Sequence, residues 1–177
     1  MSPKTVILLA MHGMPPGDFP GKDLAEWGRL HSSLEQMKGE DFTVAEKRFQ
    51  ELERKLRSWP RTPDNDPFHK ASHDLAGKME GKLGLRVIVA FGEFCSPSME
   101  DGFQAAVREG AGRVVVMTPM MIRGGSHSEA DIPRAIEKAR LRFPNLAIDY
   151  VWPYEDSKIA EFLSEQVLPY LEAAPKA

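Results

Sequence analysis

Four apolar runs punctuate the chain, and they lie at 5–11, 86–91, 114–117 and 146–151. None of them alternates apolar and polar residues, a pattern typical of strands buried on both faces of a parallel sheet. Amphipathic helical patterns separate the runs, which predicts an α/β fold with right-handed crossovers and a four-stranded parallel sheet flanked by helices. We expect the flavodoxin-like strand order 2-1-3-4, which places the first and third strands side by side.

Three helices are predicted after the second, third and fourth strands. Ser96-Pro97 is expected to begin the first, with Ser96 as its N-cap and Pro97 at its first helical position. Ser128 or Asp131 is expected to cap the second, whose inward residues are Ile132, Ile136, Ala139 and Phe143. The third, from about Asp156, is expected to bury an apolar stripe formed by Ile159, Phe162, Leu163, Val167 and Leu171.

The segment between the first two strands is unusually long. About 70 residues lie there, where a crossover helix with its loops needs far fewer. Amphipathic patterns mark helices in it: Thr43 and Glu46 fit a capping box, and Asp66-Pro67 fits a helix start. We therefore predict a single α/β domain over residues 1–177 with a helical insertion at about 14–83 after the first strand.

Composition narrows the functional classes. The net charge of -3 gives no basic footprint for nucleic acid and no polybasic face for a membrane. No stretch reaches the roughly 20 apolar residues of a membrane span, and the opening apolar run is shorter than a signal peptide requires. The single cysteine, Cys95, excludes an internal disulfide and favours a reducing cytoplasm.

Three strands are each followed by a residue that can bind a metal or accept a proton: His12, Glu93 and His127. In open α/β sheets the carboxyl ends of the strands meet at the ligand-binding edge, so we expect these side chains to converge. Two imidazoles with one carboxylate suit divalent ions such as Co²⁺, Ni²⁺, Fe²⁺ or Zn²⁺. Because no cysteine pair is present, the pattern favours an open, exchangeable site over a closed structural zinc site.

Other candidates have weaker patterns. His69 and His73 are spaced i, i+4 on a predicted helix and can hold a metal on one face, although a solvated face explains them as well. His31 has no evident partner. Cys95 can be interpreted as a nucleophile, or as a buried small residue. No GxGxxG fingerprint follows the first strand, so no dinucleotide site is predicted.

Three segments together resemble a known family: VILLAMHG at 6–13, VAFGEFCSPSMEDG at 89–102 and GAGRVVVMTPMMIRGGSHSEADIP at 110–133. They look like the sirohydrochlorin cobaltochelatase family of class II tetrapyrrole chelatases, in its short, single-lobe form. The resemblance covers the first strand and most of residues 85–165. It implies a lyase-type chelatase of cobalamin or siroheme biosynthesis in which His12 and His127 bind the metal to be inserted and Glu93 assists in metal or proton handling.

The resemblance also implies a sirohydrochlorin-like substrate with several carboxylates and a divalent metal as second substrate, without an organic cofactor. Arg123, Gly124, Gly125 and Ser126, with the helix start that follows, offer cations and backbone N–H groups to those carboxylates. Arg123 is equally explained as a solvated loop residue. One sheet edge gives a flat macrocycle only one wall, and short family members supply the other as homodimers. Here the insertion can cover the pocket, mediate a dimer or block the ring.

Three classes of function follow. The first is a chelatase that inserts Co²⁺, Ni²⁺ or Fe²⁺ into a sirohydrochlorin-like ring. The second is a non-catalytic protein of the same fold that binds a metal or a tetrapyrrole. The third is a hydrolase that uses Cys95 or a metal-bound water.

Overall fold

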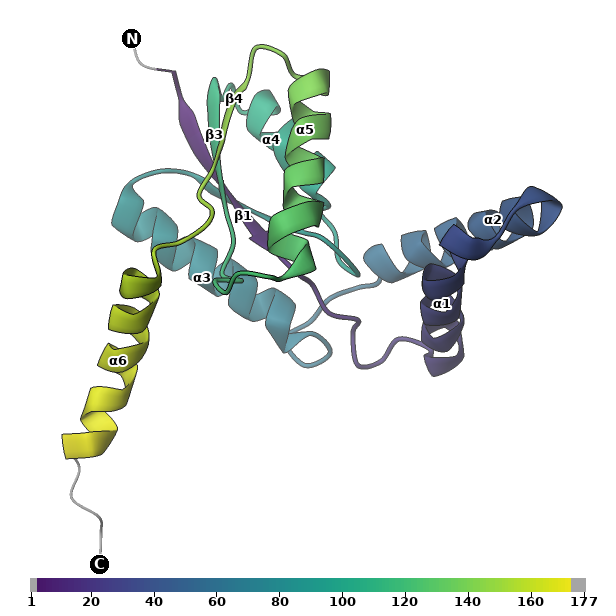
Figure 1. Cartoon of the computed structure of the whole chain (residues 1–177), viewed down its shortest axis with the longest axis horizontal. Helices are drawn as coiled ribbons and strands as arrows, with labels where there is room; N and C mark the ends of the chain where they lie inside the picture. The colour runs from purple at the N-terminus through teal and green to yellow at the C-terminus, as the bar shows by residue number, and fades with distance from the viewer. Residues whose placement is uncertain (1–2, 173–177) are drawn as a thin grey trace, which may run out of the picture.

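The computed structural model describes residues 3–172 of the 177-residue chain (Figure 1). Its parallel sheet has the order β2-β1-β3-β4, which confirms the predicted topology. The strands are β1 (Thr5–Met11), β2 (Val87–Phe91), β3 (Arg113–Met117) and β4 (Ala147–Tyr150). The helices are α1 (Gly21–Ser33), α2 (Gly39–Arg57), α3 (Pro67–Leu83), α4 (Met99–Arg108), α5 (Ile132–Arg142) and α6 (Asp156–Glu172).

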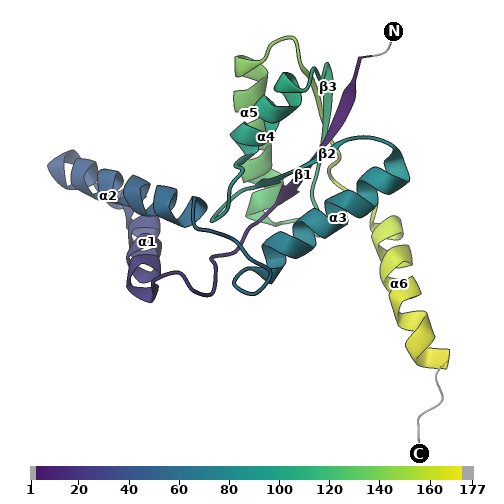
Figure 2. The same cartoon turned by 180° about the vertical axis from the view of Figure 1, so that it is seen from behind.

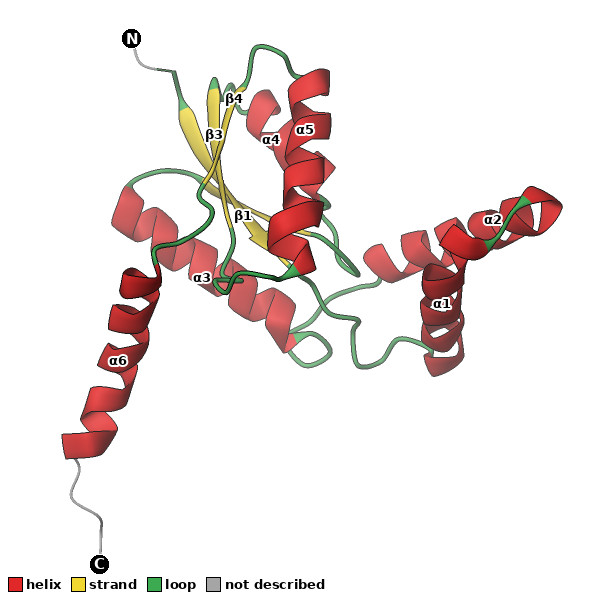
Figure 3. Cartoon of the chain, in the orientation of Figure 1, coloured by secondary structure: helices red, strands yellow, loops and turns green. Residues whose placement is uncertain are grey.

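Helices cover both faces of the sheet, as Figure 3 shows. Alternate residues of β1 point to opposite faces. Val6, Leu8 and Ala10 pack in the core beneath α4 and α5, whereas Ile7 and Leu9 pack on the side of α3. Every residue of β2 is buried, which explains why the strand sequences show continuous apolar runs.

The segment after β1 has two parts. Its first two helices, α1 and α2, form an arm that projects from the carboxyl end of the sheet (Figures 1 and 2). Its third helix, α3, packs against β2 and so serves as the crossover helix of the sheet. As predicted, α3 begins at Pro67, and the side chain of Asp66 caps it by accepting a hydrogen bond from the His69 N–H at 2.8 Å. The projecting part therefore ends before Pro67.

Three predicted helix starts are wrong. Helix α2 begins at Gly39 without a side-chain cap, so Thr43 and Glu46 lie inside it and form no capping box. Ser98 caps α4 in place of Ser96, and its capping box includes Asp101. Neither Ser128 nor Asp131 caps α5, because one π-helical turn over His127–Asp131 leads directly into the helix.

The last helix departs from the prediction in its packing. Of the expected inward residues of α6, only Ile159 is buried. The helix projects away from the sheet on the side opposite the arm (Figure 1). Its remaining apolar side chains are exposed: Phe162, Leu163, Val167, Leu168 and Leu171. No helix within residues 3–172 is long and apolar enough to cross a membrane.

The carboxyl ends of β1 and β2 are tied together by their backbones. The N–H of Gly92 donates to the carbonyl oxygen of Met11 at 2.8 Å, and that of Glu93 donates to His12 at 2.9 Å. This approach requires a glycine at position 13. Gly13 has a φ of 98°, and a Cβ there would lie 2.1 Å from the carbonyl oxygen of Glu93.

We therefore expect Gly13→Ala to lower the free energy of unfolding by about 2 kcal/mol or more, because it combines a left-handed backbone with a clash against main chain. Urea denaturation measures the effect. Gly28→Ala is the control: a Cβ at Gly28 meets nothing within 4 Å, and alanine in a helix interior should stabilise the protein by roughly 0.5–1 kcal/mol. Equal stabilities of the two variants would contradict this account.

Candidate metal centre

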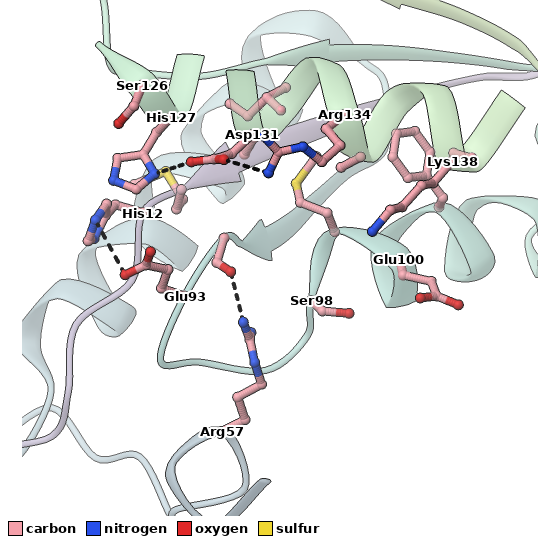
Figure 4. Close-up of a pocket in the computed structure, with 18 of the residues that line it drawn as sticks. His12, Arg57, Glu93, Ser98, Glu100, Ser126, His127, Asp131, Arg134 and Lys138 are labelled. Carbon is pink, nitrogen blue, oxygen red and sulfur yellow. Dashed lines mark hydrogen bonds and ion pairs between the residues drawn. The ribbon is translucent and has the colours of Figure 1, made fainter. Parts of the chain in front are cut away.

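Three neighbouring strands deliver the three predicted residues to one point. His12 follows the last residue of β1, Glu93 lies two residues after β2, and His127 begins the π-helical turn between β3 and α5. Because β1 pairs with β2 on one side and β3 on the other, their carboxyl ends are adjacent. Figure 4 shows the three side chains pointing toward one another.

The geometry brings their ligand atoms within the reach of one metal ion. One ligand atom from each of His12, Glu93 and His127 lies within 4.8 Å of the other two. The Nε2 atom of His12 is 3.9 Å from Oε2 of Glu93. The two imidazole rings meet edge to face, with centroids 4.4 Å apart. Each side chain is between a quarter and a third exposed, so the cluster opens to solvent.

Hydrogen bonds orient both imidazoles. Nδ1 of His12 lies 2.7 Å from the carbonyl oxygen of Gly13, and Nδ1 of His127 lies 2.9 Å from Oδ2 of Asp131. Carbonyl and carboxylate oxygens only accept, so each Nδ1 carries a proton and donates it. This tautomer leaves Nε2 to bind a metal, and partners of this kind fix metal-binding histidines in proteins. Asp131 is a supporting residue that the sequence reasoning did not identify, although its i, i+4 spacing from His127 was visible.

A cavity of about 770 Å³ extends from this cluster along α4 and α5. Its size lies in the range of small-molecule sites. Arg134, Lys138 and Arg142 form a basic row on α5 at i, i+4, i+8 spacing, and all three line the cavity. Arg134 pairs with Asp131, and Arg142 pairs with Glu100. Lys138 forms no ion pair or side-chain hydrogen bond with the described residues, so its charge is available to an anionic ligand.

The structure does not bring the predicted carboxylate-binding loop to this cavity, apart from one residue. Ser126 lines it, whereas Arg123, Gly124 and Gly125 do not. The backbone N–H of Gly124 is already bonded to the side chain of Glu129 at 2.9 Å. The basic row on α5 is a better candidate than this loop for binding carboxylates. The i, i+4, i+8 spacing of its residues was visible in the sequence.

The remaining candidates do not join the cluster. Cys95 is fully buried, and burial raises the pKa of its thiol, which disfavours the nucleophilic thiolate. His69 and His73 lie on α3, and burial lowers the pKa of both imidazoles. In the part of the chain that the structure describes, His12, Glu93 and His127 form the only group of three potential metal ligands of these residue types.

The fold and the cluster of two imidazoles and a carboxylate define the class as an α/β protein with a candidate metal site. The family model CbiX matches residues 65–169, more than half of the chain, and the chain therefore belongs to the CbiX family. The resemblance inferred from the sequence is confirmed. The matched region excludes the α1–α2 arm.

Curated relatives match a little under half of the chain. The sirohydrochlorin ferrochelatase of Priestia megaterium is 34% identical over 80 residues, which are 45% of this chain and 30% of that protein. The sirohydrochlorin cobaltochelatase of the same organism is 33% identical over 76 residues, which are 43% of this chain and 24% of that protein. The matched part thus spans less than a third of either relative.

Two solved structures share the fold. One is a putative cobalamin (vitamin B12) biosynthesis CbiX protein from Marinobacter aquaeolei VT8, with a TM-score of 0.57, 15% identity and coverage of 96% of this chain and 99% of that chain. The other is SirB from Bacillus subtilis with Fe³⁺, with a TM-score of 0.52, 17% identity and coverage of 97% of this chain and 48% of that chain.

We predict that His12→Ala and His127→Ala each abolish binding of Co²⁺, measured by isothermal titration calorimetry, because each removes one imidazole ligand. Asp131→Asn should weaken binding roughly 10- to 100-fold, since it loosens the orientation of His127. His69→Ala is the matched control and should bind Co²⁺ like the unchanged protein. If both His12→Ala and His127→Ala bound Co²⁺ with full affinity, His12, Glu93 and His127 would not form the metal site.

Proposed function

We propose that this protein is a chelatase that inserts a divalent metal, Co²⁺, Ni²⁺ or Fe²⁺, into a sirohydrochlorin-like tetrapyrrole. The convergence of His12, Glu93 and His127 at the mouth of a cavity with a basic row carries the proposal. Membership of the CbiX family and the names of the curated relatives support it. The ion and the tetrapyrrole are both substrates in this reaction.

The donor set suits a metal that must be released again. Two neutral imidazoles and a carboxylate bind borderline divalent ions, yet they form neither the thiolate shell nor the closed tetrahedron of a structural zinc site. The partial exposure of the three side chains leaves coordination positions open to water and to the incoming ring nitrogens. His12 and His127 hold the ion in this proposal, and Glu93 lowers the cost of bringing a dication to the cavity.

Insertion also requires two pyrrole N–H protons to leave the ring. Glu93 can accept a proton while the metal is bound, and each imidazole can accept one after its Nε2 has passed the ion to the ring; both residue types serve as general bases in proteins. Glu93 lies 3.9 Å from Nε2 of His12, so a proton accepted by Glu93 can pass to that nitrogen once the ion has left it. The same three groups thus serve metal delivery and proton removal.

The basic row on α5 supplies the anchor for the ring's carboxylates. Lys138 offers an uncompensated charge, and Arg134 and Arg142 can exchange their present carboxylate partners for those of the substrate. Figure 4 shows Arg134 and Lys138 following one another along α5 away from His127, and Arg142 also lines the cavity. Carboxylates bound there would hold the ring centre near the metal.

The spectral assay of insertion tests this function. Metal-free sirohydrochlorin and Co²⁺, Ni²⁺ or Fe²⁺ are mixed with catalytic amounts of protein, and the visible spectrum of the ring is followed. We expect the spectrum of the metallated ring to develop faster than in buffer, and His127→Ala to return the rate to that of buffer. His73→Ala provides the control at a histidine outside the cavity.

The outcomes separate the alternatives. Stoichiometric binding of ring and metal without acceleration would contradict the chelatase proposal and indicate a binding protein. Hydrolysis of esters or amides that is lost in Cys95→Ser would indicate a hydrolase, which the buried thiol with its raised pKa disfavours.

We also propose that the protein forms a homodimer through α6. Apart from Ile159, the large apolar side chains of this helix are roughly half or more exposed, and they form a stripe that soluble monomers rarely leave uncovered. Two copies related by a twofold axis would bury the same stripe on both chains.

Light scattering after gel filtration should then give about twice the chain mass of 19.8 kDa. Leu163→Glu combined with Val167→Glu should give the single-chain mass, because charges would enter the paired stripe. Glu165→Lys, a change at an exposed charged position on the polar face of the same helix, should remain dimeric. A single-chain mass for the unchanged protein would refute the dimer.

A further inference from the structure

The arm forms part of the cavity that contains the candidate metal ligands His12, Glu93 and His127. Besides the sheet edge and α5, the cavity is lined by residues of α1 and α2: Trp27, His31, Phe49, Glu53 and Arg57. The family match begins at residue 65 and therefore includes neither the arm nor β1 with His12. A ligand bound in this cavity would therefore lie against the arm.

Three aromatic side chains of the arm present nearly parallel rings. Trp27 and His31 stack with centroids 5.0 Å apart and planes 8° apart. Phe49 lies 5.9 Å from both, with interplanar angles of 29° to Trp27 and 24° to His31. Trp27 is buried and fixed by donating its indole N–H to Glu53 at 2.5 Å, whereas Phe49 is partly exposed and His31 is exposed. The last two are therefore free to contact a ligand.

Aromatic contacts continue from the arm to the metal cluster. The ring of Phe94 lies 4.9 Å from that of Trp27 and 5.8 Å from that of His12, measured between centroids. Phe94 follows Glu93 directly and has a φ of 59°, a conformation that costs a non-glycine residue about 1 kcal/mol or more. This backbone conformation of Phe94 places its aromatic ring between the arm and His12.

Two arginines fix the arm relative to Glu93. Arg57 donates to the carbonyl oxygens of Gly92 at 2.8 Å and Cys95 at 2.7 Å. Arg61, in the loop after α2, donates to the carbonyl oxygen of Leu56 in α2 at 2.9 Å and to that of Phe94 at 2.6 Å, and it forms a buried ion pair with Asp66 at 2.6 Å. The carbonyls of Gly92, Phe94 and Cys95 belong to the loop that carries Glu93. These hydrogen bonds fix the position of the arm relative to the loop that carries Glu93.

We propose that the α1–α2 arm is the second wall of the tetrapyrrole site, supplied by the same chain, with Phe49 and His31 contacting the macrocycle. This inference rests on the proposed function. A tetrapyrrole is a flat conjugated disc, and aromatic side chains are the surface that such a disc stacks on most favourably. The sheet edge with α5 offers it the metal and the carboxylate anchors, and the arm offers the aromatic surface. A second copy is then not required to enclose the ring.

Binding of metal-free sirohydrochlorin in the absence of metal tests the arm separately from insertion. The dissociation constant is obtained from the change in the ring's absorbance on titration with protein. Phe49→Ala and His31→Ala should each weaken ring binding, and the double variant should weaken it roughly tenfold or more, as expected for lost stacking. Affinity for Co²⁺ should remain unchanged in all of them, which also shows that the site remains folded.

Phe42→Ala is the matched control, because Phe42 is a partly buried phenylalanine of the same helix that does not line this cavity. It should bind the ring like the unchanged protein. Unchanged ring affinity in the Phe49→Ala, His31→Ala double variant would overturn the second wall while leaving the chelatase function intact. Ring binding that is lost in the monomeric α6 variant but kept in the arm variants would overturn it too, and would assign the wall to a second copy. Failure of the unchanged protein to bind any ring would refute the proposed function together with this inference.

Discussion

The site depends on one close approach between two loops. Gly13, with a φ of 98°, lets the backbone after β1 lie against the carbonyl of Glu93, and the bond from the Glu93 N–H to His12 fixes that distance. Because His12 and Glu93 are adjacent to these backbone contacts, their separation is set by main chain. His127 comes to the same point through β3, which pairs with β1. The rigid sheet thereby preorganises a ligand set whose side chains remain partly open to solvent.

The arm extends this preorganisation outward. Arg57 and Arg61 bind the carbonyls around Glu93, and Phe94 continues the aromatic surface from Trp27 to His12. The insertion is therefore coupled to the metal cluster through hydrogen bonds and packing. In the proposed function, metal, protons and carboxylates are handled by the sheet edge and α5, and the face of the ring is handled by the arm.

The fold and the metal cluster were predictable because short-range patterns determine them. Continuous apolar runs identify buried strands, and strand ends converge in a parallel sheet, so His12, Glu93 and His127 were found together. The helix starts were less accurate, since local signals such as Thr43 with Glu46 do not reveal which competing start the tertiary structure selects. Contacts between the arm and the Glu93 loop join residues far apart in sequence, and no local pattern indicates them. The apolar stripe of α6 was predicted to be buried, but it is exposed. The spacing of apolar residues identifies an apolar face of a helix and does not show what covers that face.

In the proposed site, one exchangeable metal ion is held by two imidazoles and a carboxylate at the carboxyl edge of the sheet. X-ray absorption spectroscopy at the cobalt edge of the Co²⁺-loaded protein tests it most directly, because the outer-shell scattering of imidazole rings counts the histidine ligands. Two imidazoles in the unchanged protein is the predicted result, and His127→Ala, which should no longer bind Co²⁺, should give only the spectrum of the ion in solution. A shell of oxygen ligands alone in the unchanged protein, or the same two imidazoles after His127→Ala, would contradict the account.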